Sequence, residues 1–230
     1  MEKVLGGNGQ IFQSAVMKWR RIFERKRAFV MLLLASTVLF MATTPLEEPS
    51  IPKAIEKEAK TALSYYPELK KLPIEFKFKD TIKKSTMQAQ PKFRRLFKPK
   101  NQRGYVILIN DKIRIGNKEI RTRDLPSDVL IGWFGHELGH IKDYQHRSAL
   151  NLLFFGIRYL LSSNYIKGAE RRADSIAVAK GMGPYILKTK AFILENADVP
   201  EPYKNRILEF YPSPEEIMHM IDELEAGESK

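Results

Sequence analysis

Two histidines, His136 and His140, lie four positions apart in a segment that reads HELGH. On a helix, residues at positions i and i+4 project from one face about a turn apart, so both imidazoles can bind one metal ion. Glu137 follows the first histidine, and there it can contact a water on the metal rather than the metal itself. This HExxH pattern predicts a hydrolytic zinc site with Glu137 as its general base.

A catalytic zinc usually keeps three protein ligands and leaves the fourth position for water, so one more ligand is expected. Glu170 and Asp174 form an ExxxD pattern, which on a helix places both carboxylates on one face. Glu170 could bind the metal while Asp174 holds the second ring nitrogen of a ligand histidine.

Two other histidines offer alternatives. His146 occupies the third histidine position of HExxHxxGxxH, although Asp143 replaces the glycine that permits the chain reversal there. His219 is either a surface residue of a C-terminal helix or a donor to the transition state. We therefore keep Glu170 and His146 as competing third ligands, with Glu170 favoured.

The segments HELGHIKDYQH and AERRADSIAVAKG resemble the gluzincin metallopeptidases, in particular the group that contains the prenyl-protein and heat-shock membrane peptidases. These enzymes pair HExGH with a later ExxAD. The resemblance is good over residues 128–183 and loose over 50–225. It implies a zincin-type α+β domain. The implied site consists of zinc ligands His136, His140 and Glu170, the general base Glu137, and Asp174 behind a ligand histidine.

The resemblance weakens near the C-terminus. The group carries a His-Pro-Ser…Arg-Ile segment there, whereas this chain has Tyr211 and Glu216 in place of the histidine and the arginine. The substrate contact that the segment makes in the group therefore does not transfer directly.

The elements that must position these residues follow from apolar spacing. Ser127 is expected to cap a helix that carries the HExxH motif, with Asp128 in its first turn. A hairpin over 105–115 is expected beside it, and its free edge is our candidate for binding the substrate backbone as an added strand. The other expected elements are helices over 51–66, 169–180 and 213–227 and a strand over 74–78.

Residues 149–161, ALNLLFFGIRYLL, form a strongly apolar segment that is too short to span a membrane. We expect a buried helix, and the alternative is a segment that dips into a bilayer or lines an apolar cleft.

The chain has 230 residues, of which 43% are hydrophobic and 29% charged, values typical of one globular domain with an appendage. It has no cysteine, so histidines and carboxylates are the only strong metal ligands available. We expect a basic cytoplasmic segment over 1–27, a transmembrane anchor over 28–44, a linker over 45–52 and the catalytic domain over 53–230.

The anchor is predicted from about 17 uncharged residues that follow a basic block and precede Glu47 and Glu48. This order predicts a cytoplasmic N-terminus and an extracytoplasmic catalytic domain. A cleaved signal peptide, which would release an exported protein, is the alternative.

The net charge of +12 leaves two further classes of partner open. Basic residues alternate with Phe93 and Phe97 around 92–103, which suits nucleic acid or an anionic membrane, but no nucleic-acid-binding motif accompanies them. The favoured function is therefore a zinc endopeptidase, with one zinc ion per chain, that cleaves exported or membrane-associated polypeptides. A metal-binding adaptor or chaperone without catalysis, and a basic nucleic-acid or membrane binder, are the alternatives.

Overall fold

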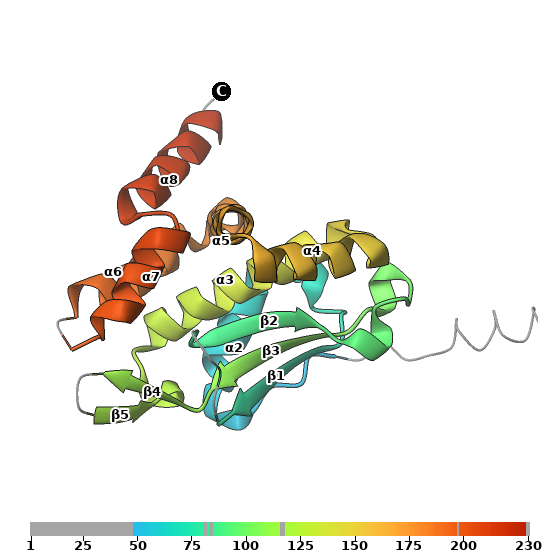
Figure 1. Ribbon diagram of the computed structural model, residues 1–230, viewed down its shortest axis with the longest axis horizontal. Helices are drawn as coiled ribbons and strands as arrows, with labels where there is room; N and C mark the ends of the chain where they lie inside the picture. Colours follow the sequence, from blue (N-terminus) through green and yellow to red (C-terminus); the bar gives the residue numbers. More distant parts are fainter. Residues whose placement is uncertain (1–47, 81, 83–84, 116–117, 197, 229–230) are drawn as a thin grey trace, which may run out of the picture. The chain divides into compact units, whose positions relative to one another are not determined.

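The computed structural model describes residues 48–80, 82, 85–115, 118–196 and 198–228, which form a mixed α and β structure (Figure 1). The predicted segments 1–27 and 28–44 lie outside the described residues. Within the described ranges, no helix has the length and apolar character needed to cross a membrane.

A three-stranded sheet contains β1 (Ile74–Lys79), β2 (Met87–Pro91) and β3 (Tyr105–Asn110) in the order β1-β3-β2. β3 pairs parallel with β1 and antiparallel with β2. The strand predicted over 74–78 is confirmed by β1, whose apolar residues alternate with charged ones. β3 is central because its continuous apolar run, YVILI, can be buried between two neighbours.

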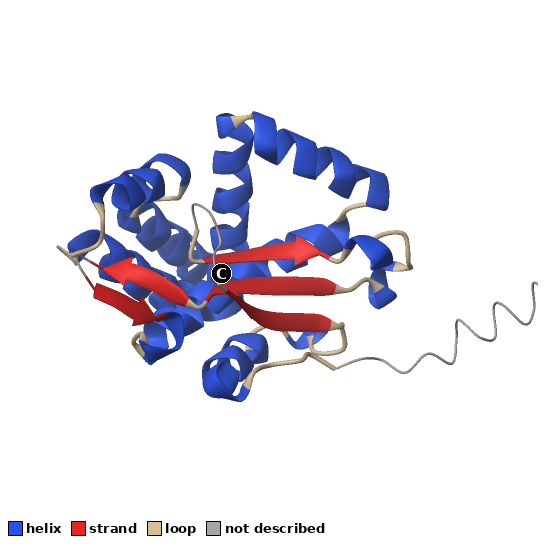
Figure 2. Cartoon of the chain, turned by 60° about the horizontal axis from the view of Figure 1, so that its bottom comes forward, coloured by secondary structure: helices blue, strands red, loops and turns tan. Residues whose placement is uncertain are grey.

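The predicted hairpin over 105–115 is wrong. β4 (Lys112–Ile115) pairs with β5 (Lys118–Arg121) in a separate two-stranded sheet (Figure 2), so β3 and β4 follow each other without pairing. Because β3 has a partner on both sides, it offers no free edge. β2 is an edge strand of the larger sheet instead.

One residue of the linker predicted over 45–52, Ser50, is paired with the sheet. Ser50 forms a bridge with Glu75, its N–H donates to the carbonyl of Ile74, and its carbonyl accepts from the N–H of Phe76. The folded domain therefore begins by Ser50.

Helices make up most of the rest of the domain. They are α2 (Glu56–Ser64), α3 (Ser127–His146), α4 (Ala149–Leu161), α5 (Ser163–Ala177), α6 (Gly183–Glu195), α7 (Glu201–Phe210) and α8 (Pro214–Glu228). Short 3-10 turns cover Lys53–Ile55, Pro67–Leu69, Phe93–Arg95, Lys100–Gln102 and Thr122–Asp124. α3 is central, because it packs against α2, β2, α5 and α6.

The helix that carries the HExxH motif starts differently from the prediction. Pro126 is its N-cap residue, and Ser127 is its first helical residue. The hydroxyl of Ser127 donates to Glu58 on α2, 2.9 Å away, so it links two helices instead of capping one. Asp128 lies in the first turn as expected, where the helix dipole favours a carboxylate.

The remaining helix predictions are confirmed with shifted bounds. α2 begins after a 3-10 turn, and α5 begins at Ser163, earlier than expected, because Ser162 caps it by accepting from the N–H of Tyr165. A π-helical turn, Val178–Met182, then ends at a bend where Gly181 has φ of 81°, a backbone angle that favours glycine. α8 opens with a capping box between Ser213 and Glu216.

The buried helix predicted over 149–161 is wrong in its burial. α4 does form, but only Leu152 and Phe155 are buried in it, and most of its other large apolar side chains are exposed. α4 carries more large apolar side chains than fit on the one face that packs against the domain.

Glu68 ties the Pro67–Leu69 turn to two other elements, since its Oε1 lies 2.8 Å from the Nζ atoms of both Lys142 and Lys180. Burial raises the pKa of this carboxyl, but the two lysines outweigh burial and lower the pKa from 4.5 to about 2. A depressed pKa in the folded state stabilises the fold above the unfolded-state value. This stabilisation is lost as the pH falls through the folded-state pKa.

We therefore expect Glu68→Gln to lower the free energy of unfolding by about 1 kcal/mol at pH 7, a figure that allows for solvent screening. The difference from wild type should shrink below about pH 4.5 and vanish near pH 2. Urea unfolding at several pH values measures it, with Glu56→Gln as the control that breaks an exposed pair with Lys60. A difference that stays constant with pH would contradict the assignment.

Candidate metal centre

α3 supplies the first part of the candidate site. His136, Glu137 and His140 are buried, with 7%, 5% and 6% of their surfaces exposed, and the two imidazole rings have centroids 4.7 Å apart. The one-turn spacing of the histidines places both rings on the same face of the helix, as the sequence predicted.

α5 brings the second part of the site to the first. Glu170 Oε2 lies 2.9 Å from Nε2 of His136 and 3.2 Å from Nε2 of His140. Asp174, one turn later, accepts from Nδ1 of His136 at 2.7 Å. Both carboxylates are almost completely buried, with 1% of each residue exposed.

Gly139 allows α5 to approach this closely. A Cβ atom at this position would lie 2.4 Å from the carbonyl oxygen of Ala173, well inside van der Waals contact. Ala173 lies between Glu170 and Asp174, so the helix that carries them rests directly on the backbone of α3. The glycine inside the HExxH motif therefore allows Glu170 and Asp174 to come within reach of the histidines.

No protein-family model, curated protein or solved structure matches this chain. The function of the site has to be inferred from its own chemistry.

His136, His140 and Glu170 form a group that fits one metal ion. Each offers one ligand atom, and these atoms lie within 4.8 Å of one another. Ligand atoms about 2.0–2.2 Å from a zinc ion lie about 3.3 Å apart in a tetrahedron, close to the distances that Glu170 makes to both histidines. Asp174 on Nδ1 of His136 leaves Nε2 as the nitrogen that faces the other ligands.

The charges around the histidines also fit a divalent cation. Three buried carboxylates, those of Glu137, Glu170 and Asp174, face one buried ammonium group, that of Lys190. With neutral histidines, this arrangement leaves two buried negative charges. Buried charge is costly unless it is compensated, and a bound divalent ion would compensate it.

The pKa shifts show the same imbalance. Burial lowers the pKa of His136, but Asp174 and Glu170 outweigh it and raise this pKa well above its usual value. Burial raises the pKa of Glu170, but His140 and His136 hold it well below its usual value. Burial also raises the pKa of Asp174, but His136 and Lys190 outweigh burial and lower this pKa. Burial is the main reason that the pKa of Glu137 is raised.

Sequence reasoning missed Lys190, Tyr159 and Tyr211, which the fold brings to the site. Lys190 Nζ on α6 lies 3.0 Å from Oδ2 of Asp174. The hydroxyl of Tyr159 donates to Oε1 of Glu170, the oxygen that does not face the histidines. Tyr211 lies with its ring centroid 5.5 Å from that of His136. Only the departure from the gluzincin segment at Tyr211 drew attention to any of them.

The two alternative histidines lie elsewhere. His146 is the exposed last residue of α3, because the helix continues through Asp143 instead of turning there. Asp143 pairs with Arg147 and Arg172. The side chain of His219 is 72% exposed on α8, which confirms the interpretation as a surface residue.

The edge strand β2 borders the site. The N–H of Ala89 donates to Oε2 of Glu137 at 2.6 Å, so this group points away from β3. At the two ends of β2, the carbonyl of Thr86 accepts from the N–H of Asn110 and the N–H of Lys92 donates to the carbonyl of Gly104, so these groups point toward β3. In an antiparallel pair, alternate residues point their backbone groups outward, so Met87 and Ala89 present theirs at the edge away from β3, where the Ala89 groups meet the side chains of Glu137 and Tyr144. The predicted binding edge at 105–115 is thus replaced by β2.

A cleft of about 520 Å³ opens over these groups, between β2, α3, α4 and α5. His136, Glu137, His140, Glu170, Ala89 and Tyr211 are among the residues that line it. A peptide segment laid along β2 in this cleft would pass beside Glu137.

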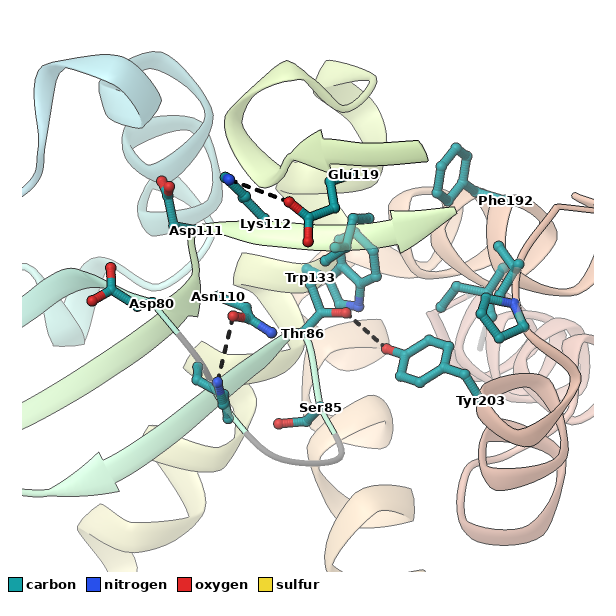
Figure 3. A pocket seen from close by; sticks show the side chains of 15 residues that line it. Asp80, Ser85, Thr86, Asn110, Asp111, Lys112, Glu119, Trp133, Phe192 and Tyr203 are labelled. Carbon is teal, nitrogen blue, oxygen red and sulfur yellow. Dashed lines mark hydrogen bonds and ion pairs between the residues drawn. The ribbon is translucent and has the colours of Figure 1, made fainter. Parts of the chain in front are cut away.

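A larger cavity, of about 650 Å³, lies next to the site rather than in it (Figure 3). Trp133, Thr86 and Tyr203 line both this cavity and the small space that contains His136 and Glu137. Tyr203 is held there by a 2.9 Å hydrogen bond between its hydroxyl and that of Thr86. Its wall carries the carboxylates of Asp80, Asp111 and Glu119 and one ammonium group, that of Lys112, which pairs with Glu119.

Proposed function

We propose that this protein is a zinc-dependent endopeptidase of the zincin type, with His136, His140 and Glu170 as the zinc ligands. The observation that carries the proposal is the meeting of two helices that places one carboxylate oxygen against both imidazoles of an HExxH motif. The buried negative charge and the cleft beside a free strand edge support it.

Zinc in this site would lower the pKa of a coordinated water and polarise the substrate carbonyl. Glu137 takes a proton from the attacking water and passes it to the leaving amine, so that one carboxylate acts first as base and then as acid. Asp174 fixes the tautomer of His136, and Lys190 holds Asp174 in place. Tyr159 restrains Glu170 by bonding its second oxygen.

The substrate backbone pairs with the outward groups of β2, chiefly the N–H and carbonyl of Ala89. Adding a strand to a free edge provides backbone hydrogen bonds without regard to side chains. In the free protein the Ala89 N–H donates to Glu137, and the Ala89 carbonyl accepts from the hydroxyl of Tyr144 at 3.4 Å, so the substrate replaces both bonds. A substrate that takes this N–H therefore frees the Glu137 oxygen beside the cleavage site.

Tyr211 donates a hydrogen bond to the oxyanion that forms when the carbonyl is attacked. Its half-buried side chain lines the cleft next to His136, and no described residue accepts a hydrogen bond from its hydroxyl. It stands where the gluzincin segment has a histidine. A phenol can replace an imidazole as a donor, because both present one N–H or O–H to an anion.

The substrates are polypeptides that are exported or lie at a membrane, consistent with the uncharged run over 28–44. The competing adaptor function, in which the site only binds metal, has no use for a carboxylate at Glu137. The close contact of Glu137 with the substrate-binding edge therefore favours hydrolysis.

The test is to purify the full chain in detergent, measure its metal by mass spectrometry and follow cleavage of a quenched fluorescent peptide library. We expect one zinc per chain, loss of cleavage on chelation and its return with added zinc. Bound zinc without cleavage would favour the adaptor. A chain that binds no zinc would refute the proposal.

A further inference from the structure

α4 exposes an unusual amount of apolar surface for a helix of a folded domain. Leu150, Phe154, Ile157, Leu160 and Leu161 have between 53% and 83% of their surfaces exposed. Leu150, Phe154, Ile157 and Leu161, spaced four, three and four residues apart, lie along one stripe of the helix, whereas Leu160 borders the cleft over the candidate metal centre. We call this stripe the outer face of α4.

The opposite side of α4 is already used. Leu152 and Phe155 are buried there, and together with Tyr159 they line the cleft over the candidate metal centre. α4 therefore cannot turn its outer face onto the domain without withdrawing these three side chains from the cleft. At about 1.5 Å per residue the 13-residue helix is about 20 Å long, too short to cross a bilayer core of about 30 Å.

A second exposed apolar group lies close to the start of α4. Phe93 and Phe97, in and just after the Phe93–Arg95 turn, are 72% and 66% exposed. Exposed cationic side chains stand beside them, namely Arg94, Lys98 and Lys100.

Hydrogen bonds connect these two groups into one end of the domain. Lys100 Nζ donates to the carbonyl of His146, and a guanidinium nitrogen of Arg103 donates to the carbonyl of Arg147, just before α4 begins. Figure 1 shows the segment around residue 95 beside the first turns of α4.

The chain enters the domain at this same end. Ser50 pairs with β1 at Glu75, near the start of the strand, and Ile74 lies opposite Tyr105, next to the Phe93–Arg95 and Lys100–Gln102 turns. Only six peptide units separate Thr44 from Ser50. They span at most about 20 Å, so an anchor over 28–44 would keep this end near the bilayer.

We propose that the outer face of α4, together with Phe93 and Phe97, docks onto the surface of an anionic lipid bilayer. An apolar helix face that enters the acyl boundary, flanked by cations that meet lipid phosphates, is the usual design of an interfacial helix. A second copy of the chain, as the alternative occupant, would require complementary apolar surface, but its binding would not require the flanking cations. If the proposed peptidase function holds, docking places the cleft beside the bilayer, where it receives polypeptide segments at the membrane surface.

The absence of cysteine gives a direct test. Single-cysteine full chains, Leu161→Cys and Phe97→Cys, are labelled with an environment-sensitive fluorophore and placed in vesicles of phosphatidylcholine and phosphatidylglycerol at 3:1. We expect blue-shifted emission and quenching by nitroxides on the lipid acyl chains. His219→Cys on α8, which is also exposed, is the matched control and should show neither effect.

The fluorescence does not depend on metal or activity, so its result is separate from that of the peptidase test. Labels at Leu161 and Phe97 that behave like the His219 label would overturn the proposal. A blue shift without vesicles that grows with protein concentration would also overturn it, in favour of a second copy. A Phe97 label that responds to an oligonucleotide but not to vesicles would assign the basic residues to nucleic acid instead.

Discussion

Glu137→Gln is expected to reduce peptide cleavage at least about 100-fold while the protein keeps one zinc per chain. General acid–base catalysis contributes roughly 10²–10⁴-fold, and glutamine has no proton to accept or return. The substitution keeps the size of the side chain, and the amide oxygen can still accept from the N–H of Ala89. Binding of substrate along β2 should therefore change little.

The measurement is kcat and KM on the same peptide, with zinc content and thermal stability recorded for each variant. Glu119→Gln, which removes an exposed carboxylate outside the metal centre, is the control and should cleave normally. Equal activity in wild type and Glu137→Gln would contradict the role of Glu137. Loss of zinc in the variant would indicate that Glu137 helps to hold the metal instead.

Tyr211→Phe is expected to lower kcat about 10²–10³-fold, the usual effect of removing one oxyanion donor. KM and zinc content should stay close to wild type, because the hydroxyl interacts with charge that exists only in the transition state. A purely structural role would not separate kcat from KM in this way. Tyr211→His should recover part of the lost rate, since the imidazole restores a donor.

Tyr203→Phe is the matched control for Tyr211. Both tyrosines lie near Glu137, but the hydroxyl of Tyr203 is already bonded to Thr86. We expect this variant to lose some stability and less than about tenfold in kcat, since removing a single neutral hydrogen bond costs about 1 kcal/mol. If Tyr203→Phe and Tyr211→Phe reduce kcat equally, the effect is not specific to an oxyanion donor.

The local parts of the candidate site could be predicted from the sequence. The helical period alone places His136 and His140 on one face, and the same period places Glu170 beside Asp174. Strand β1, the bend at Gly181 that follows α5 and the start of α8 near Ser213 were also predicted, because alternation, a glycine and a serine before a proline act over a few residues. Each of these features depends on neighbours within one or two turns of the chain.

The partners of each element were not predictable, because pairing depends on contacts between distant residues. The run from Tyr105 suits a strand in a hairpin as well as the centre of a sheet, and only its two partners decide between them. The same holds for α4, whose apolar sequence suggested burial. Its exposure depends on which surfaces the rest of the chain leaves for it to cover.

The HExxH motif, the ExxxD carboxylates and the lack of any cysteine ligand follow from the sequence alone, and they define the chemistry that this protein can support. Only the tertiary structure joins them, through the contact of Gly139 with Ala173 that sets Glu170 against both histidines. The fold also selects β2 as the edge beside Glu137 and brings Lys190 and Tyr211 to the centre from α6 and the end of α7. Local sequence fixes which face of a helix a residue occupies, whereas the neighbour of that face depends on packing across the whole chain.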